Sequence, residues 1–266
     1  MRPVSHFTSD LSWDQYEERL KGGAIVLVPV GAHESHGHHM AMGTDTIEVI
    51  DCCRRVSEQL DVVITPSIPF GYKSQTRSSA GNHWPGNIAL GGDTLTSVVK
   101  DVLVALRNHS AERIAVIDSH YENGWFLIEA CELATAATPD AKGTIVSMLC
   151  WNAISEECWE RIYEVSGPMD LSLAHAGVLE TSAMLRIAPD VVDMERQPKH
   201  DYVEFPPYDV FPPDPTVVPP TGVLSSPENS SGELGELIME DMSRNLARHL
   251  AAAFGVDDSK LAGGKG

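Results

Sequence analysis

The sequence lacks three features that would each point to a different class of protein. No stretch of its 266 residues approaches the roughly eighteen consecutive apolar residues of a membrane span. The beginning of the chain lacks the charged region and apolar stretch of a secretory signal, so we expect a cytoplasmic protein without a membrane partner. Lys and Arg number 19 against 38 Asp and Glu, and the net charge of −19 argues against nucleic-acid binding, which needs clustered positive charge.

The five cysteines lack a recognisable spacing. Cys52 and Cys53 are adjacent, whereas Cys131, Cys150 and Cys158 are scattered along the chain. Neither a zinc motif nor a redox motif has this arrangement. We therefore expect buried, reduced thiols.

Short apolar runs alternate with amphipathic stretches along the chain. Apolar runs at 24–30, 62–64, 113–117 and 144–149 predict strands, and the run at 62–64 predicts a buried one. Helical spacing predicts helices between them, and a last helix over about 232–253. This alternation predicts an α/β fold: a single three-layer α/β/α domain over residues 1–255 with a mostly parallel sheet. Ligand sites in such sheets lie at the carboxyl ends of the strands.

Three segments interrupt this alternation. Residues 71–92 form a long polar, glycine-rich loop, and loops of that length in compact domains are usually functional or disordered. Residues 205–222 are rich in proline and predict an extended arm that wraps the domain or, as we prefer, a neighbouring subunit. Residues 256–266 are expected to form a flexible tail.

Two tripeptides set a carboxylate and an imidazole one residue apart, directly after a strand. Glu34-Ser35-His36 follows the first predicted strand, and His120-Tyr121-Glu122 follows the third. In extended chain, residues i and i+2 point the same way, so each tripeptide can offer two ligands to one spot. Together with Asp45 they supply five ligands for a pair of divalent metals, zinc or manganese. The alternative is that these are ordinary solvated loop residues.

Asp45 is predicted to bridge the two metals, because it has no ligand partner one residue away. We assign Glu34 and His120 to one metal, and His36 and Glu122 to the other. A metal pair of this kind holds a hydroxide between its ions, and the hydroxide attacks a polarised carbonyl. Hydrolysis of an amide or a related C–N bond is therefore the expected reaction.

A departing nitrogen must receive a proton, and an imidazole is suited to donate it. His175 is the candidate donor, with Glu180 as the carboxylate that orients it. A packed or capping histidine is the alternative interpretation of His175. Three further histidines crowd the first loop, and we expect them to be solvated or to support the ligands: His33, His38 and His39.

Several motifs resemble those of the creatininase (creatinine amidohydrolase) family. They are PVGAHESHGHH at 29–39 with GTD at 43–45, HYEN at 120–123, HAGVLETS at 175–182 and FPPYDVFP at 205–212. Further matches at 71–75 and 81–83 indicate the branch that gives the family its name. The likeness extends from about Leu11 to Ala253 and covers most of the chain.

The resemblance implies an α/β amidohydrolase that binds two divalent ions, Zn and/or Mn, and a small-molecule substrate, and that assembles as a homohexamer. By motif match, the metal positions are Glu34, His36, Asp45, His120 and Glu122. The positions implied for catalysis are His175, Glu122 and Glu180, and those implied for substrate binding are Ser78, Tyr121 and Trp151.

One segment departs from the family pattern. Creatininase carries Trp-Asp-x-Glu before the matched histidine, in a loop that closes on the substrate, whereas this chain has Leu171-Ser172-Leu173-Ala174. The change removes cation–π and charge-assisted contacts to a planar cationic ring. We expect a small cyclic amide as substrate, creatinine or a related lactam or heterocycle. The alternatives are a deformylase or amidase of the same family acting on a non-creatinine heterocycle intermediate, and a noncatalytic metal-binding scaffold.

Overall fold

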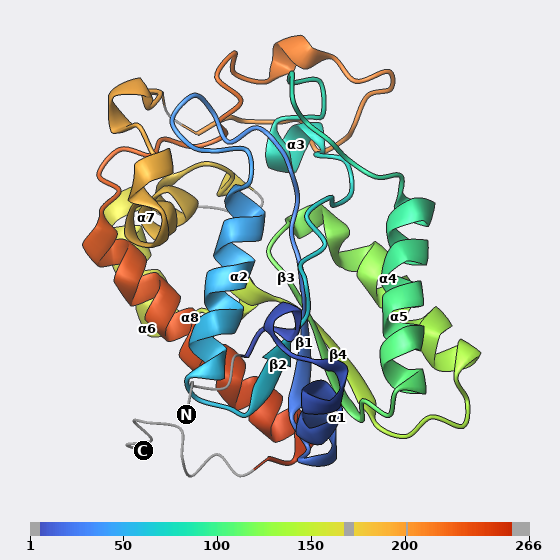
Figure 1. Cartoon of the computed structure of the whole chain (residues 1–266). Coiled ribbons are helices and arrows are strands. Elements are labelled where there is room, and N and C mark those ends of the chain that lie inside the picture. Colours follow the sequence, from blue (N-terminus) through green and yellow to red (C-terminus); the bar gives the residue numbers. More distant parts are fainter. Residues whose placement is uncertain (1–5, 168–172, 201, 257–266) are drawn as a thin grey trace.

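Four short apolar segments form a parallel β-sheet through the centre of the structure (Figure 1). The computed structural model describes residues 6–167, 173–200 and 202–256. Its strands are β1 (Ile25–Val30), β2 (Val62–Ile64), β3 (Arg113–Asp118) and β4 (Thr144–Leu149). They lie in the order β2-β1-β3-β4, and all neighbouring pairs are parallel. The strands and their parallel arrangement predicted from the sequence are confirmed.

Helices cover both faces of the sheet (Figure 1). One face packs against α1 (Trp13–Lys21), α4 (Gly92–Asn108) and α5 (Gly124–Ala137). The other packs against α2 (Thr44–Ser57), α6 (Glu156–Ser166), α7 (Val178–Ile187) and α8 (Gly232–Phe254). A hydrophobic core lies on each face of the sheet. Successive residues of β1 belong to these two cores alternately, because strand side chains point to opposite faces. Leu27 packs in the core with α2 and α8, and Val28 packs in the core with α4 and α5. The expected three-layer α/β/α domain is confirmed.

Helix α6 was not predicted from the sequence. Cys158 and Ile162 of its eleven residues are buried, and Trp159 and Val165 pack against the same core, so the sequence did carry the helical spacing. Its start is fixed by Ser155, whose Oγ accepts a hydrogen bond of 3.2 Å from the Cys158 backbone amide. Shorter turns connect the other elements: η1 (Thr8–Asp10), α3 (Thr76–Ser79), η2 (Tyr121–Asn123), η3 (Cys150–Ala153), η5 (Pro189–Val191), η6 (Met194–Arg196) and η7 (Pro215–Val217).

The loop of residues 71–92 and the Pro-rich arm of residues 205–222 lie next to each other above the carboxyl ends of the strands (Figure 1). Phe205 anchors the arm by packing near Ala80 and Leu224. Farther along the arm, Tyr208 and Phe211 are 62 % and 78 % exposed. Contact of the arm with another subunit stays a prediction.

Some expectations fall on residues outside the described part of the chain. These are the predicted tail from residue 257 onward, and Leu171 and Ser172 in the segment that departs from the family. All five cysteines are free thiols, and all except Cys131 are buried. Among the described residues, no helix combines the length and apolar character needed to cross a membrane.

Candidate active site

The predicted site residues gather where β1 and β3 end. These strands are parallel neighbours, so the loops that follow them leave the sheet at the same edge. Two helices add carboxylates from their first turns: α2 carries Asp45 and α7 carries Glu180. Glu34, Asp45 and His120 are each 1–2 % exposed. Topology thus brings residues far apart in the sequence to one buried place.

Three groups of side chains within the described residues are close enough to hold a cation. They are Glu34, Asp45 and His120; His36, Asp45 and Glu180; and Glu34, His36 and His175. Within each group the potential ligand atoms lie within 4.8 Å of one another. Asp45 belongs to two of the groups, so it connects them.

The contacts within these groups leave room for an ion. Nδ1 of His120 lies 3.1 Å from Oε1 of Glu34. Nε2 of His36 lies 3.6 Å from Oε2 of Glu180 and 3.8 Å from Oδ1 of Asp45. The last two distances exceed a good hydrogen bond, so these atoms approach one another without pairing directly.

Unpartnered polar atoms provide the test of whether the site fits a metal. Nε2 of His36 and Oδ2 of Asp45 are buried and have no hydrogen-bond partner. Leaving such a group unsatisfied costs about 1–3 kcal/mol, and more when it is charged. A divalent cation satisfies both atoms, and a mixed imidazole and carboxylate donor set suits zinc or manganese. The residues therefore fit the predicted ions.

Burial and neighbouring charges shift the pKa values of these side chains. Burial, followed by repulsion from Glu34, raises the pKa of Asp45 well above its usual range. Burial opposes ionisation of Glu34, but His120 and His175 hold its pKa below the usual range. Burial and repulsion from His175 lower the pKa of His36 to about 3. A neutral imidazole is the form that binds a metal ion, so His36 is in the required state.

The second tripeptide does not continue as extended chain. Directly after His120 the backbone enters the 3₁₀ turn η2. The extended conformation assumed for this tripeptide is therefore not present, because a 3₁₀ turn rotates successive residues by about 120° instead of 180°. The role of Glu122 as a metal ligand stays a prediction. Oε2 of Glu122 lies 3.4 Å from Nε2 of His120, on the side of the ring away from Glu34. Glu122 belongs to none of the three groups found among the described residues.

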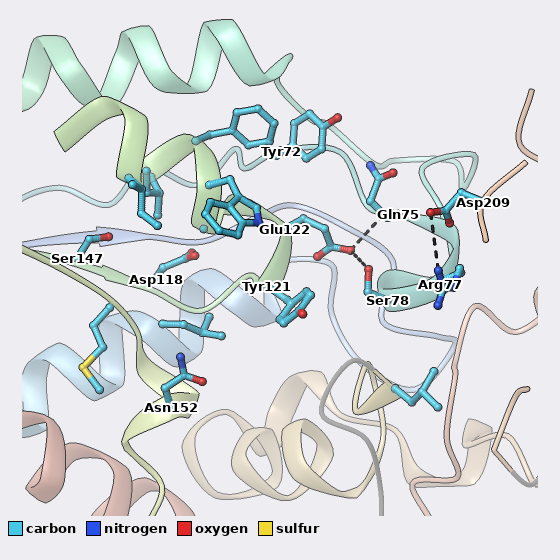
Figure 2. A pocket seen from close by; sticks show the side chains of 18 of the residues that line it. Tyr72, Gln75, Arg77, Ser78, Asp118, Tyr121, Glu122, Ser147, Asn152 and Asp209 are labelled. Carbon is cyan, nitrogen blue, oxygen red and sulfur yellow. Dashed lines mark hydrogen bonds and ion pairs between the residues drawn. The ribbon is translucent and has the colours of Figure 1, made fainter. Parts of the chain in front are cut away.

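Glu122 is held instead by the loop of residues 71–92 (Figure 2). Its Oε1 accepts hydrogen bonds from Ser78 Oγ at 2.5 Å, Ser79 Oγ at 2.8 Å and the Gln75 amide at 3.1 Å. The loop that the sequence marked as functional or disordered thus reaches the site and orients a carboxylate.

A groove leads from the surface to this carboxylate. It has a volume of about 1030 Å³, and Figure 2 shows Tyr121, Glu122 and Ser78 along it. A smaller cavity of about 30 Å³ touches the metal-binding groups and shares Ser78, Tyr121 and Leu149 with the groove. Trp151 lines the smaller cavity, and its Nε1 donates a 3.1 Å hydrogen bond to the Ser119 carbonyl. The three residues predicted to bind substrate therefore lie around one passage.

His175 belongs to one of the three groups, but it is oriented differently from expectation. Its Nε2 is 2.8 Å from the Ser35 carbonyl, and its Nδ1 is 3.6 Å from Oε1 of Glu34. Glu180, the carboxylate expected to orient it, accepts a 2.6 Å hydrogen bond from the Ala176 amide. A backbone carbonyl of the first tripeptide therefore fixes the imidazole of His175.

The other histidines of the first loop behave as expected. His39 is buried, its Nε2 lies 3.0 Å from Oγ1 of Thr181, and burial lowers its pKa to about 4. His38 is exposed and His33 is half-buried. These residues support the loop or face solvent.

Sequence reasoning missed two buried carboxylates near the site. Glu48 is fully buried with both oxygens unpartnered, and burial followed by repulsion from Glu180 raises its pKa. The sequence feature that could have identified Glu48 is its position one helical turn after Asp45. Asp118, the last residue of β3, is also buried, and burial raises its pKa to about 7. The sequence feature that could have identified Asp118 is an acidic residue at the end of an apolar strand.

Comparisons with known proteins agree with this geometry. The sequence matches the sequence model of the creatininase family, described as creatinine amidohydrolase, over residues 9–250. It is 39 % identical to creatinine amidohydrolase of Pseudomonas putida over 256 residues, which cover 94 % of this chain and 98 % of that protein. It is 22 % identical to 3-dehydro-scyllo-inosose hydrolase of Thermotoga maritima over 194 residues, which cover 73 % of this chain and 60 % of that protein.

Solved structures extend the likeness to three dimensions. A structure of creatininase with Mn has a TM-score of 0.90 to this chain, at 38 % identity over 94 % of this chain and 99 % of the other. A creatininase variant of the Zn-Zn type has a TM-score of 0.91 at the same identity and coverage.

Proposed function

This chain belongs to the creatininase family of hydrolases, and from that premise we propose that it hydrolyses the C–N bond of a small cyclic amide with the help of two divalent cations. The substrate we propose is creatinine or a related lactam or heterocycle. The observation that carries the proposal is the buried convergence of Glu34, His36, Asp45, His120 and Glu180, in which Nε2 of His36 and Oδ2 of Asp45 have no hydrogen-bond partner.

Two ligand sets support two ions. We propose one ion on Glu34, Asp45 and His120, and the other on His36, Asp45 and Glu180. This keeps the bridge and the first pair predicted from the sequence, and it gives the second ion Glu180 in place of Glu122. Zinc and/or manganese are proposed because the donor set suits both and because similar structures carry those metals in their names.

The chain's own residues supply the remaining chemistry. Two divalent ions, when bound, lower the pKa of water and polarise an amide carbonyl. Glu122, oriented by Ser78 and Ser79, faces the groove and is suited to pass a proton at Oε2, which accepts a 3.0 Å hydrogen bond from Ser79 Oγ. His175 is held at Nε2 by a backbone carbonyl, so Nδ1 is the atom from which it protonates the departing nitrogen.

The substrate enters through the groove. Tyr121 stands at its mouth, 55 % exposed, and Trp151 lies deeper, 4 % exposed. The cavity at the metal-binding groups measures about 30 Å³, which favours a small amide that presents its reactive bond there. Ser78 lies at the junction of groove and cavity and is proposed to contact the substrate.

A rival substrate class within the same chemistry is favoured by Leu173. This residue lines the groove and belongs to the segment that departs from the family pattern. An aliphatic side chain offers a cationic ring neither a π face nor a charge. A deformylase or amidase acting on a neutral heterocycle intermediate fits this wall of the groove as well.

We also propose that the protein is a homo-oligomer, as the family likeness suggests. The exposed aromatic residues of the Pro-rich arm, Tyr208 and Phe211, support a contact with another subunit. A single domain over residues 1–255 is proposed on the same likeness.

Turnover by metal-loaded protein tests the proposal. Protein loaded separately with zinc and with manganese is incubated with creatinine, a series of lactams and a formylated heterocyclic amine, and products are followed by chromatography. We expect hydrolysis of at least one cyclic amide and loss of it after chelation. If only the formylated compound is hydrolysed, the rival class is correct. If the protein binds no metal and hydrolyses nothing, it is a noncatalytic scaffold.

A further inference from the structure

Asn123 connects three segments directly below the metal-binding groups. It is fully buried. Its Nδ2 donates hydrogen bonds to Oδ1 of Asp118 at 2.9 Å and to the Gly31 carbonyl at 3.2 Å. Its Oδ1 accepts a 2.7 Å hydrogen bond from the Tyr72 amide. One amide side chain thus joins the ends of β1 and β3 to the loop of residues 71–92.

The peptide groups of Tyr72 carry this connection to His120. The Tyr72 amide is bound to Asn123, and the Tyr72 carbonyl lies 3.1 Å from Nε2 of His120. The His120 amide in turn donates a 3.1 Å hydrogen bond to Oδ1 of Asp118, the same oxygen that Asn123 binds. Asn123 therefore controls both the backbone of His120 and the acceptor that its ring faces.

Close packing makes this arrangement specific. A Cβ atom at Gly71 would meet Oδ1 of Asn123 at 2.6 Å and the Gly31 carbonyl oxygen at 2.7 Å, both shorter than real contacts allow. The backbone before Tyr72 can approach Asn123 this closely only because residue 71 is glycine.

The acceptor at Nε2 decides which nitrogen of His120 is available for an ion. With the proton on Nε2 and directed at the Tyr72 carbonyl, Nδ1 keeps its lone pair on the side of Glu34, 3.1 Å from its Oε1. Glu122 offers a competing acceptor, with Oε2 3.4 Å from the same Nε2. A displaced Tyr72 carbonyl would let the ring turn toward that carboxylate.

We propose that Asn123 is a positioning residue that fixes the orientation and tautomer of His120 through the peptide groups of Tyr72. The proposal rests on the proposed function in one respect, namely that His120 binds an ion. Asn123 itself touches neither an ion nor the substrate. Its effect is on how tightly the first ion is held.

Zinc affinity of the Asn123→Ala variant tests the proposal. The dissociation constants of the full chain and its variants are measured by competition with a chromophoric chelator, and unfolding of the metal-free proteins by thermal denaturation. We expect Asn123→Ala to bind the first of the two zinc ions, the one proposed for Glu34, Asp45 and His120, roughly 10- to 100-fold less tightly than wild type, as is usual when the support of a ligand is removed.

Thr138→Ala is the matched control. Thr138 is also buried, and it directly follows the last residue of α5. Its Oγ1 accepts a 2.6 Å hydrogen bond from Nε of Arg107 in α4. In the metal-free state, both variants should unfold at a lower midpoint temperature than wild type. Only Asn123→Ala should bind zinc less tightly. Equal zinc affinities for Asn123→Ala and wild type would overturn the proposal, whereas wild-type protein that binds no zinc would overturn the proposed function.

A measurement on wild-type protein applies even if Asn123→Ala does not fold. Nitrogen-15 NMR of labelled histidine, with the His120 signals identified by their loss in His120→Gln, reports which ring nitrogen carries the proton in the zinc-loaded protein. A proton on Nε2 is expected. A proton on Nδ1 would overturn the proposal.

Discussion

The two tripeptides that follow β1 and β3 each set a glutamate and a histidine one residue apart, but these side chains end in different surroundings. Glu34 and His36 both enter the metal-binding groups, and their neighbour Ser35 lends its carbonyl to His175. In the second tripeptide only His120 enters, and Tyr121 is 55 % exposed. Equal spacing therefore did not produce equal sites.

The difference arises from the backbone that follows each strand. The first tripeptide lies in irregular chain before a turn at residues 37–39, whereas the second begins the turn η2 at once. In that turn, Glu122 accepts hydrogen bonds from Ser78 and Ser79, and Asn123 accepts one from the Tyr72 amide. The first loop thus supplies two of the proposed ligands, and the second supplies one proposed ligand together with groups that surround it.

Asp45→Asn should have the largest effect, because Asp45 belongs to both ligand sets. We expect the rate of hydrolysis to fall on the order of 10³-fold or more. The metal content, measured by atomic absorption, should fall as well. Burial and repulsion from Glu34 raise the pKa of Asp45, so removing its charge should not lower the stability of the metal-free protein. Asp51→Asn, on the same helix but half-buried and paired with Arg54 and Arg55 outside the ligand sets, is the control. An Asp45→Asn protein with two bound ions would contradict the ligand sets.

His36→Ala tests the first tripeptide by itself. Nε2 of His36 is buried without a partner, so its removal leaves the second ion with carboxylates alone. We expect loss of one bound ion per chain, a decrease in turnover on the order of 10²-fold, and a folded protein by circular dichroism. Unchanged metal content would exclude His36 as a ligand.

Glu122→Gln tests the second tripeptide. The variant keeps the shape of the side chain but cannot pass a proton, so kcat should fall by roughly 10²-fold while KM changes little. Steady-state kinetics and metal analysis on the same preparation separate two roles. If Glu122→Gln also loses an ion, Glu122 is a ligand, and the two tripeptides are more alike than this geometry indicates.

Tyr121→Ala tests the exposed middle residue of the second tripeptide. Loss of an aromatic contact of about 1 kcal/mol should raise KM by about fivefold. Tyr121→Phe keeps the ring and should retain the wild-type KM. A fivefold increase in both variants would instead assign the contact to the hydroxyl group.

Glu236→Gln should have the smallest effect, because it lies away from both tripeptides. Glu236 on α8 binds Arg55 of α2 at 2.8 Å and also pairs with Arg186 of α7, and these hydrogen bonds lower its pKa from 4.5 to about 2. A lowered pKa adds stability above about pH 4.5, and that stability is lost as the pH falls toward 2.

Urea unfolding at several pH values measures this contribution. Partial exposure limits it to about 1 kcal/mol at pH 7, and the difference between Glu236→Gln and wild type should vanish near pH 2. Glu240→Gln, exposed on the same helix, should match wild type throughout. A difference that persists at pH 2 would mean that Glu236 stabilises by packing, and turnover should be unaffected in either case.

The sequence determined the strands, most helices and the edge of the sheet where the site forms. Continuous apolar runs such as Ile25–Val30 can only be buried strands in a chain of this pattern, and parallel neighbours bring Glu34 and His120 together. The helical spacing of Cys158 and Ile162 was also present in the sequence, so α6 was predictable although it was missed.

Only the tertiary structure decided where each side chain turns after its strand ends. The direction of Glu122 depends on hydroxyl groups more than forty residues earlier in the chain, and Glu180 reaches His36 because α7 packs over the same edge. Local pattern fixes where the backbone leaves the sheet, because burial of apolar side chains dominates there. Beyond that point, competition among hydrogen-bond partners from distant segments sets the outcome, and no local spacing encodes it.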